Sequence, residues 1–290
     1  DAPKGYSWFR VDVSDLLGGH SGDDIDKGRA NSNKILARLV YETQSSMNVR
    51  LSHFDGGNLR NAIPRESVAV VMVKASDVEA LNAEVAAFEQ VAIAEYAAVE
   101  DAISIKAAEV AAPASVMPCA VAKSLMAAMV ACPDGVDKMS LAMEGLVQTS
   151  NNMARVVSDG ETIKVQTLVR SSVRSEKEAL ADAIKAVLEM AGFEVKLSGS
   201  YDGWNPNMQS PILNAMLESY EALYGKRPAV TAIHAGLECG IIGSNYPGLD
   251  MISFGPTICY PHSPDEKVEI ASVEKFFDFL LHTLRNAPKK

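Results

Sequence analysis

The sequence predicts an α/β protein that divides into two domains. Three observations lead to this prediction. Short apolar strand patterns alternate with amphipathic helix patterns along the chain. A similar order of strand, turn, strand and helix occurs twice within residues 1–197, and the composition changes to turn residues around 199–207. We therefore expect a first domain over residues 1–197, built from two similar α/β halves, and a second domain over residues 198–290.

The composition is that of a globular protein and excludes several kinds of partner. The 290 residues are 48% hydrophobic and 22% charged, which is enough for a sizeable core. A net charge of −10 argues against binding nucleic acid or an anionic membrane, and no apolar run reaches membrane-spanning length. The four cysteines form no CxxC pair, which favours reduced thiols and a cytoplasmic location. Because residue 1 is aspartate, we expect the chain to begin inside a longer protein.

The first half opens on a strand pattern over residues 6–14 and then a glycine-rich turn. Ser21 and Asp24 match a capping box, which predicts a helix over residues 25–40. His20 would then precede a helix N-terminus, where outward amide groups favour a neutral imidazole that donates a hydrogen bond. Two interpretations remain open for His20, a surface residue after a turn or an electrophile toward a substrate carbonyl.

The rest of the first domain follows the same alternation. Serine followed three residues later by glutamate predicts two further helix starts, and the second helix stops at Gly192. Regions rich in β-branched residues predict the strands between them. The predicted elements are strands over 46–53, 67–74 and 162–170, helices that begin after Ser76 and Ser175, and a loop over 111–118.

The second domain alternates helices with two short apolar strands. A helix is expected from Pro211, strands over 229–233 and 251–255, and a last amphipathic helix over 273–281. This alternation is typical of a parallel, doubly wound sheet. Two or three strands cannot form a covered parallel sheet of ordinary size, so we expect part of this domain to come from elsewhere.

Two loops at predicted strand ends carry candidate metal ligands. His262 lies between two prolines that restrict the backbone, and it is either a ligand or an ordinary surface histidine. His234 and Glu238 could form a ligand pair, or Glu238 could cap a helix. No His-x-Asp pair follows an apolar strand, no Glu-Glu pair lies in a loop, and no GxSxG motif occurs.

Four motifs together resemble a known family. They are Gly-Gly-His-Ser-Gly at 18–22, Asn-Ala-Ile-Pro at 61–64, His-Ala-Gly-Leu-Glu-Cys-Gly at 234–240, and Phe-Gly-Pro-Thr at 254–257 with His-Ser-Pro-Asp-Glu at 262–266. In order and spacing this set is similar to the aminoacyl-histidine dipeptidases, also called peptidase D or Xaa-His dipeptidases. These belong to the aminoacylase and carboxypeptidase-like dizinc peptidases. The resemblance covers nearly the whole chain.

The resemblance implies a duplicated two-layer α/β lid and part of a doubly wound zinc-peptidase catalytic domain. Residues 1–197 would be the lid and dimerisation domain, and residues 198–290 the C-terminal part of the catalytic domain. Trp204 would wall the pocket or pack in the domain joint. The implied roles are a catalytic His20 that polarises the scissile carbonyl, Asn61 and Glu238 near the substrate, Arg170 on the substrate carboxylate, and His262 as a metal ligand.

The resemblance also implies the cofactor and the partners. Two Zn²⁺ ions are expected in the intact enzyme, with Mn²⁺ or Co²⁺ as alternatives, together with a small peptide substrate and a homodimer formed through the lid. The family's His-x-Asp pair, bridging Asp and Glu-Glu pair lie upstream of the lid and are absent from these residues, so we expect this chain alone to be inactive. Two alternatives stay open. The chain may act only as a silent binding or dimerisation fragment, or the parent enzyme cleaves N-acyl amino acids or tripeptides.

Overall fold

The computed structural model describes residues 5–159, 161–200, 203–204, 207–232, 238–259 and 266–288. The chain divides into two compact units, residues 1–200 and 201–290. The elements of the first unit are β1 (Tyr6–Ser14), β2 (Gly19–His20), the short 3-10 helix η1 (Ile25–Lys27), α1 (Ser32–Ser46), β3 (Arg50–Gly56), β4 (Ala62–Ile63), β5 (Ser67–Lys74), the 3-10 helix η2 (Ala75–Asp77), α2 (Val78–Tyr96), β6 (Ser104–Val110), α3 (Cys119–Ala131), β7 (Gly135–Met139), β8 (Val147–Ser158), β9 (Ile163–Ser171) and α4 (Arg174–Met190).

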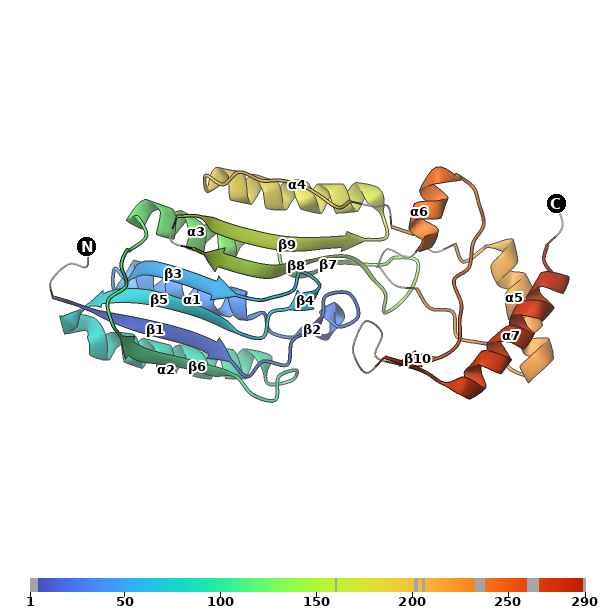
Figure 1. Cartoon of the computed structure of the whole chain (residues 1–290), viewed down its shortest axis with the longest axis horizontal. Coiled ribbons are helices and arrows are strands. Elements are labelled where there is room, and N and C mark those ends of the chain that lie inside the picture. The colour runs from blue at the N-terminus through green and yellow to red at the C-terminus, as the bar shows by residue number, and fades with distance from the viewer. Residues whose placement is uncertain are drawn as a thin grey trace. The chain divides into compact units, whose positions relative to one another are not determined.

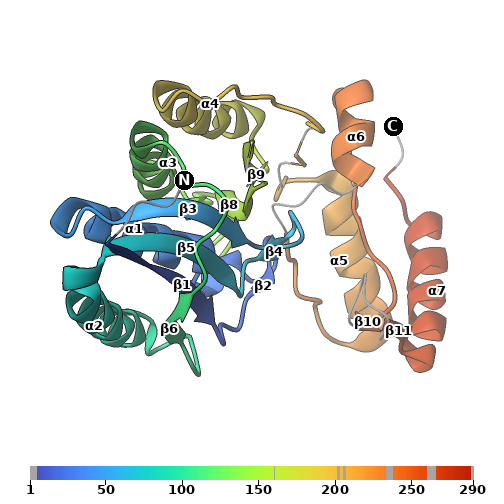
Figure 2. The ribbon, with the colours of Figure 1, turned by 60° about the vertical axis from the view of Figure 1, so that its left-hand side comes forward.

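The first unit is one antiparallel sheet covered by helices. The seven-stranded sheet has the order β6-β1-β5-β3-β8-β7, and β9 also pairs with β8. The helices contact one another in the order α2, α1, α3, α4, and Figure 1 shows α1, α2 and α3 behind the strands. One apolar cluster lies between the two layers and includes Phe54, Leu36, Met126 and Leu180. The mixed α/β class predicted from the sequence is confirmed, and the strands of both predicted halves join the same sheet (Figure 2).

The predicted start of the first helix, after Ser21, is wrong. The chain makes only the short 3-10 helix η1 there, which ends at Gly28 with a left-handed φ of 66°. α1 starts instead at Ser32, because the Asn31 side chain caps it by accepting the Asn33 amide at 3.0 Å. The Asp24 carboxylate accepts the His20 amide, so it does not form the predicted box with Ser21.

The other elements of the first unit follow the sequence closely, apart from their caps. β5 has the predicted bounds, whereas β3 begins four residues after the predicted start at residue 46 because α1 runs on to Ser46. Neither α2 nor α4 has a side-chain cap, so the two predicted capping boxes are wrong. The Ser76 hydroxyl donates to Asp77 instead.

The second unit contains three helices and one small ribbon. Its elements are α5 (Pro211–Tyr224), α6 (Glu238–Asn245), β10 (Ile258–Cys259), β11 (Lys267–Val268) and α7 (Ile270–Arg285). α5 starts as predicted, because Ser210 accepts the Leu213 amide at 3.0 Å and Pro211 takes the first helical position. The aromatic rings of Phe254, Phe276, Phe279 and Tyr220 pack together against α7.

Two strands predicted in the second unit do not form. Residues 229–232 and 251–255 have no regular structure, and residue 233 lies outside the described residues. A strand persists only when its backbone groups pair with a neighbour. Within the described part of this unit, β10 and β11 pair only with each other. The described residues therefore contain no parallel sheet here, although both segments have the apolar pattern of strands.

Candidate functional site

A two-stranded ribbon brings two of the predicted site residues together. β2 pairs with β4, which places His20 opposite Ala62 and Gly19 opposite Ile63. The Ser21 amide also donates to the Asn61 carbonyl at 2.8 Å. His20 and Asn61 therefore lie beside each other at the end of this ribbon.

Two adjacent glycines are required by the path of the chain into this ribbon. Gly18 has a φ of 63° and Gly19 a φ of 147°, which L side chains rarely adopt. A Cβ on Gly18 would lie 2.3 Å from Cγ of Arg65, and a Cβ on Gly19 would lie 2.6 Å from Oδ2 of Asp24. Any larger residue would displace the loop that presents His20.

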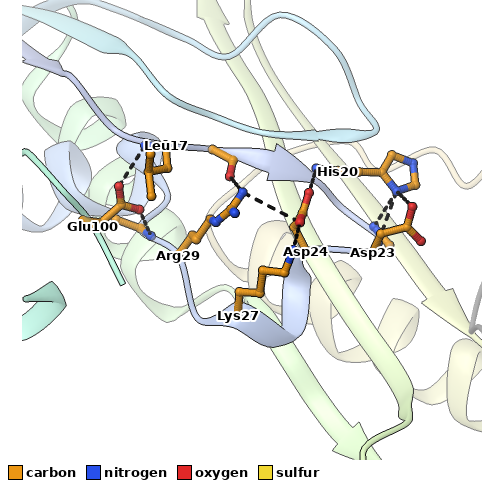
Figure 3. Close-up of polar contacts among 10 residues, drawn as sticks. Leu17, His20, Asp23, Asp24, Lys27, Arg29 and Glu100 are labelled. Atoms are coloured by element: carbon orange, nitrogen blue, oxygen red, sulfur yellow. Dashed lines mark hydrogen bonds and ion pairs between the residues drawn. The ribbon is translucent and has the colours of Figure 1, made fainter. Parts of the chain in front are cut away.

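The hydrogen bonds of the His20 ring select one tautomer. Its Nδ1 atom accepts the amides of Gly22 at 3.3 Å and Asp23 at 3.2 Å. An accepting Nδ1 leaves the proton on Nε2 of a neutral ring. The Asp23 carboxylate lies 3.4 Å from Nδ1, on a side chain that is 62% exposed. The two amides leave Nε2 as the ring nitrogen that can contact another molecule, and they come from a turn and not from a helix end (Figure 3).

Asp24 holds the turn that carries His20. Its carboxylate accepts the His20 amide at 2.7 Å and pairs with Lys27 and Arg29. Burial would raise the pKa of Asp24, but the hydrogen bonds from Lys27 and the His20 amide outweigh it and lower that pKa. Arg29 also donates to the Gly18 carbonyl, so the turn is tied at both of its ends (Figure 3).

Glu100 fixes both ends of the longer loop around this turn. Its two carboxylate oxygens accept the amides of Leu17 and Ala30, each at 2.8 Å. The side chain is buried, and its hydrogen bonds join residues 83 and 70 positions apart in the sequence. Figure 3 shows this carboxylate between the two ends of the loop. A buried carboxylate that accepts two backbone amides rigidifies the support of His20.

Replacing Glu100 by alanine should lower the free energy of unfolding by about 3 kcal/mol, because one buried amide and one part-buried amide lose a charged acceptor. Glu100→Gln should cost about half as much, since an amide oxygen still accepts one of the two bonds. Urea unfolding, followed by a spectroscopic signal from the first unit, measures the free energy of unfolding of both variants. Glu79→Gln, on the exposed side of α2, is the matched control. Equal stability of Glu100→Ala and the wild type would show that the loop is held by other contacts.

Arg170 reaches the same place from the main sheet. It lies on β9 opposite Ser150 of β8. Its guanidinium carbon would lie 3.6 Å from a Cβ built on Gly22, the residue whose amide donates to His20. The structure therefore brings His20, Asn61 and Arg170 into one region of the first unit.

Asn152 belongs to this region and was not predicted from the sequence. It is buried on β8, and its side-chain amide donates to the carbonyls of Ala62 at 2.8 Å and Arg60 at 3.4 Å. These two carbonyls flank Asn61 in the sequence, so Asn152 ties the ribbon to the sheet. The available signal was a pair of asparagines inside a strand pattern, where asparagine is uncommon.

The remaining predicted site residues lie in the second unit. Glu238 is the first residue of α6, where a carboxylate interacts favourably with the helix N-terminus. Trp204 is half-buried and lies outside any helix or strand. His262 and His234 lie outside the described residues.

The described residues do not provide a metal centre. No group of three or more histidine, cysteine, aspartate or glutamate side chains within them could hold a metal ion. A dinuclear site needs several such ligands around each ion. The two zinc ions expected from the sequence resemblance therefore have no ligand set in this part of the protein.

No helix in the described ranges combines the length and apolarity needed to cross a membrane.

Comparison with known proteins identifies the relatives of this chain. Residues 2–100 match the family described as the peptidase dimerisation domain of the M20 type. The chain is 35% identical, over 99% of its length, to the cytosol non-specific dipeptidase of Escherichia coli (strain K12), and it covers 59% of that protein. The crystal structure of aminoacylhistidine dipeptidase from Vibrio alginolyticus matches all of this chain with a TM-score of 0.94 and 38% identity.

This chain again covers 59% of the Vibrio protein, so it spans about three fifths of the length of both relatives. The family resemblance predicted from the motifs is confirmed. Residues 2–100 match the M20 peptidase dimerisation domain, and the chain as a whole is similar to these two dipeptidases.

Proposed function

We propose that the protein takes part in the hydrolysis of dipeptides of the Xaa-His type, with its first unit acting as a lid over the substrate. The observation that carries this proposal is the His20 ring, whose Nδ1 accepts two backbone amides and which lies beside Asn61 and near Arg170. The kinship with dipeptidases supports the reaction class. The presence of a histidine in the substrate rests on the name of the Vibrio relative.

In the proposed reaction, His20 binds the carbonyl oxygen of the scissile bond. Negative charge develops on this oxygen as water attacks the carbonyl carbon, and a donor already in position stabilises that charge with little reorganisation. The side chain of His20 is 34% exposed, so a substrate can reach it. The amides of Gly22 and Asp23 keep the ring from turning its acceptor nitrogen toward the substrate.

Arg170 and Asn61 are proposed to hold the substrate. The planar guanidinium of Arg170 matches the free carboxylate of a dipeptide in two parallel hydrogen bonds. Asn61 can both donate and accept, which suits the polar groups next to the scissile bond. Glu238 remains a proposed substrate contact of the intact enzyme, and its position at the start of α6 equally supports a structural role as a helix cap.

We place the metal ions in the part of the related dipeptidases that this chain does not span, with His262 as the ligand from this chain. A bound zinc ion supplies an activated water nucleophile. The described residues contribute substrate binding and carbonyl polarisation, and these steps do not depend on the identity of the metal.

A hydrolysis assay with two proteins tests the proposal. The intact protein should cleave Xaa-His dipeptides and should lose this activity on metal removal, whereas residues 1–290 alone should be inactive. N-acyl amino acids and tripeptides should be poorer substrates. Preference for either of these would change the substrate class, and activity in the 290-residue chain would refute the proposed location of the metal ligands.

We also propose that the protein forms a homodimer through the first unit and acts in the cytosol, the location in the name of the Escherichia coli relative. β6 lies at one end of the strand order and can pair with a further strand. The adjacent helix α2 exposes an uncharged stripe of four alanines, one valine and one glutamine, namely Ala83, Ala86, Ala87, Gln90, Val91 and Ala94. In a two-fold symmetric dimer, β6 and this stripe of one copy would contact β6 and the same stripe of the second copy.

Ala87→Glu should convert the proposed dimer to a monomer, because a two-fold axis sets the introduced charges close together in a desolvated interface. The dissociation constant should rise by at least about 100-fold. Analytical ultracentrifugation measures it, and Ala186→Glu on the exposed side of α4 is the control. A dimer that survives Ala87→Glu unchanged would place the interface elsewhere.

A further inference from the structure

A pocket of about 500 Å³ opens in the first unit between η1, the start of α1, the end of α2 and the start of β7. Its wall includes Arg29, Asn31, Lys34, Tyr96, Asp134 and Asn152. The reaction proposed above uses none of these side chains directly. We call this the α1–β7 pocket and consider what its free hydrogen-bonding groups would recognise.

Asp134 places a carboxylate in this wall without a cation bonded to it. Its oxygen accepts the Met153 amide at 2.6 Å and the Asn31 side-chain amide at 3.2 Å, and both donors are neutral. Among the described residues no lysine or arginine lies within ion-pair distance of it. Burial raises the pKa of Asp134 to about 6. A half-buried carboxylate that forms no ion pair can still accept hydrogen bonds from a charged ligand in the pocket.

The two cations in the wall are committed to other groups. Lys34 donates to the carbonyls of Met129 at 2.6 Å, Val130 at 2.9 Å and Cys132 at 2.7 Å. These bonds use all three ammonium protons at the C-terminal end of α3. Arg29 donates to the Gly18 carbonyl and shares its charge with Asp24. Neither side chain forms an ion pair with Asp134, although the charge of Lys34 opposes the effect of burial on the pKa of Asp134.

Asn152 adds a second free acceptor to the same wall. Its Nδ2 is used by the carbonyls of Ala62 and Arg60, which fixes the orientation of the amide. Its Oδ1 is buried and has no hydrogen-bond partner among the described residues. A buried acceptor without a donor requires an explanation of its own. Two acceptors in the wall can therefore take further hydrogen bonds. They are the carboxylate of Asp134, which directly precedes β7, and Oδ1 of Asn152 on β8.

We propose that the α1–β7 pocket binds a small organic molecule through a primary ammonium group, whose protons are accepted by the Asp134 carboxylate and Asn152 Oδ1. An ammonium group carries the charge that Asp134 lacks and supplies three donors. A metal ion fits less well, because no group of three metal-ligating side chains occurs in the described residues. The net charge of −10 favours the approach of a cation.

Calorimetry on the intact protein tests this with n-butylamine as the probe and n-butanol and butyrate as matched compounds. n-Butylamine should bind, and the alcohol and the acid should bind at least about 10-fold more weakly. Asp134→Asn keeps an acceptor for Met153 and should weaken amine binding by at least about 10-fold. Asp137→Asn, an exposed carboxylate on β7, should leave it unchanged.

The amide resonance of Met153 gives a readout that needs no variant, because this amide donates to Asp134. n-Butylamine should shift this resonance, and n-butanol should not. Equal binding of the three compounds, unchanged affinity in Asp134→Asn, tighter binding of Mg²⁺ than of the amine, or an unmoved Met153 resonance would each overturn the proposal. Binding lost in Asp134→Asn and retained in Asp137→Asn would establish it, and would also exclude the peptide site as the place where the amine binds.

Discussion

Replacing His20 by alanine is expected to lower kcat for an Xaa-His dipeptide by about 10²–10³-fold, the usual effect of losing one donor to a developing oxyanion. KM should change much less, because the carbonyl oxygen gains most of its charge only in the transition state. Bound metal should stay at the wild-type level, since His20 lies in the first unit on a ribbon held by backbone pairing. Steady-state kinetics with metal analysis of the same samples measures all three quantities.

Two further variants serve as controls for the role proposed for His20. Asp23→Asn removes the exposed carboxylate 3.4 Å from Nδ1 but keeps the backbone amide that donates to it, so kcat should change little. His282→Ala, in α7, is the control for loss of a histidine elsewhere. One result would contradict the proposed role. If His20→Ala contains less metal than the wild type but has the same kcat per bound metal ion, His20 acts in metal binding.

Local patterns predicted the elements of the first unit well and their ends poorly. Strand β5 was placed to the residue, because alternating apolar side chains with β-branched character leave little choice. The helix caps failed because serine and aspartate side chains have several partners within reach. Asp24 bonds the His20 amide, and the start of α1 is set by Asn31, whose side chain also reaches Met153 on β8. No local window of sequence contains that contact.

The residues that support the site are hidden from the sequence for the same reason. His20 and Asn61 were identified because they lie in motifs that resemble those of a known family. Glu100 and Asn152 bond to groups 70 to 92 positions away in the chain. Their importance appears only when the fold has placed their hydrogen-bond partners beside them.

In the second unit the sequence pattern and the structure disagree over strands 229–233 and 251–255. An apolar run specifies a tendency to be buried and extended, but hydrogen bonds to a neighbour make it a strand. Phe254 instead packs its ring against Phe276 and Phe279 of α7, so part of the tendency is satisfied by side-chain contacts although Phe254 stays 37% exposed. A parallel sheet would require neighbouring strands that the described residues of this unit do not contain.

Arg170→Ala is expected to raise KM for free dipeptides by about 100-fold, because a charged hydrogen-bonded pair with the substrate carboxylate is worth about 2–3 kcal/mol. kcat should fall less than KM rises, since the carboxylate does not change charge during the reaction. Arg170→Lys should recover only part of the loss, because an ammonium group cannot make the two parallel bonds of the guanidinium. The comparison requires initial rates over a wide range of dipeptide concentration.

A dipeptide amide separates this role from a structural one. The wild type should prefer the free acid over the amide by about the same 100-fold, and Arg170→Ala should lose that preference, since neither substrate then has a guanidinium to bind. A variant damaged only in its fold would lose activity toward both substrates and keep their ratio. Arg174→Ala, at the exposed start of α4, supplies the control for loss of a nearby arginine. If the ratio of free acid to amide is the same in the wild type and in Arg170→Ala, the carboxylate is bound by another group and Arg170 only supports the turn around Gly22.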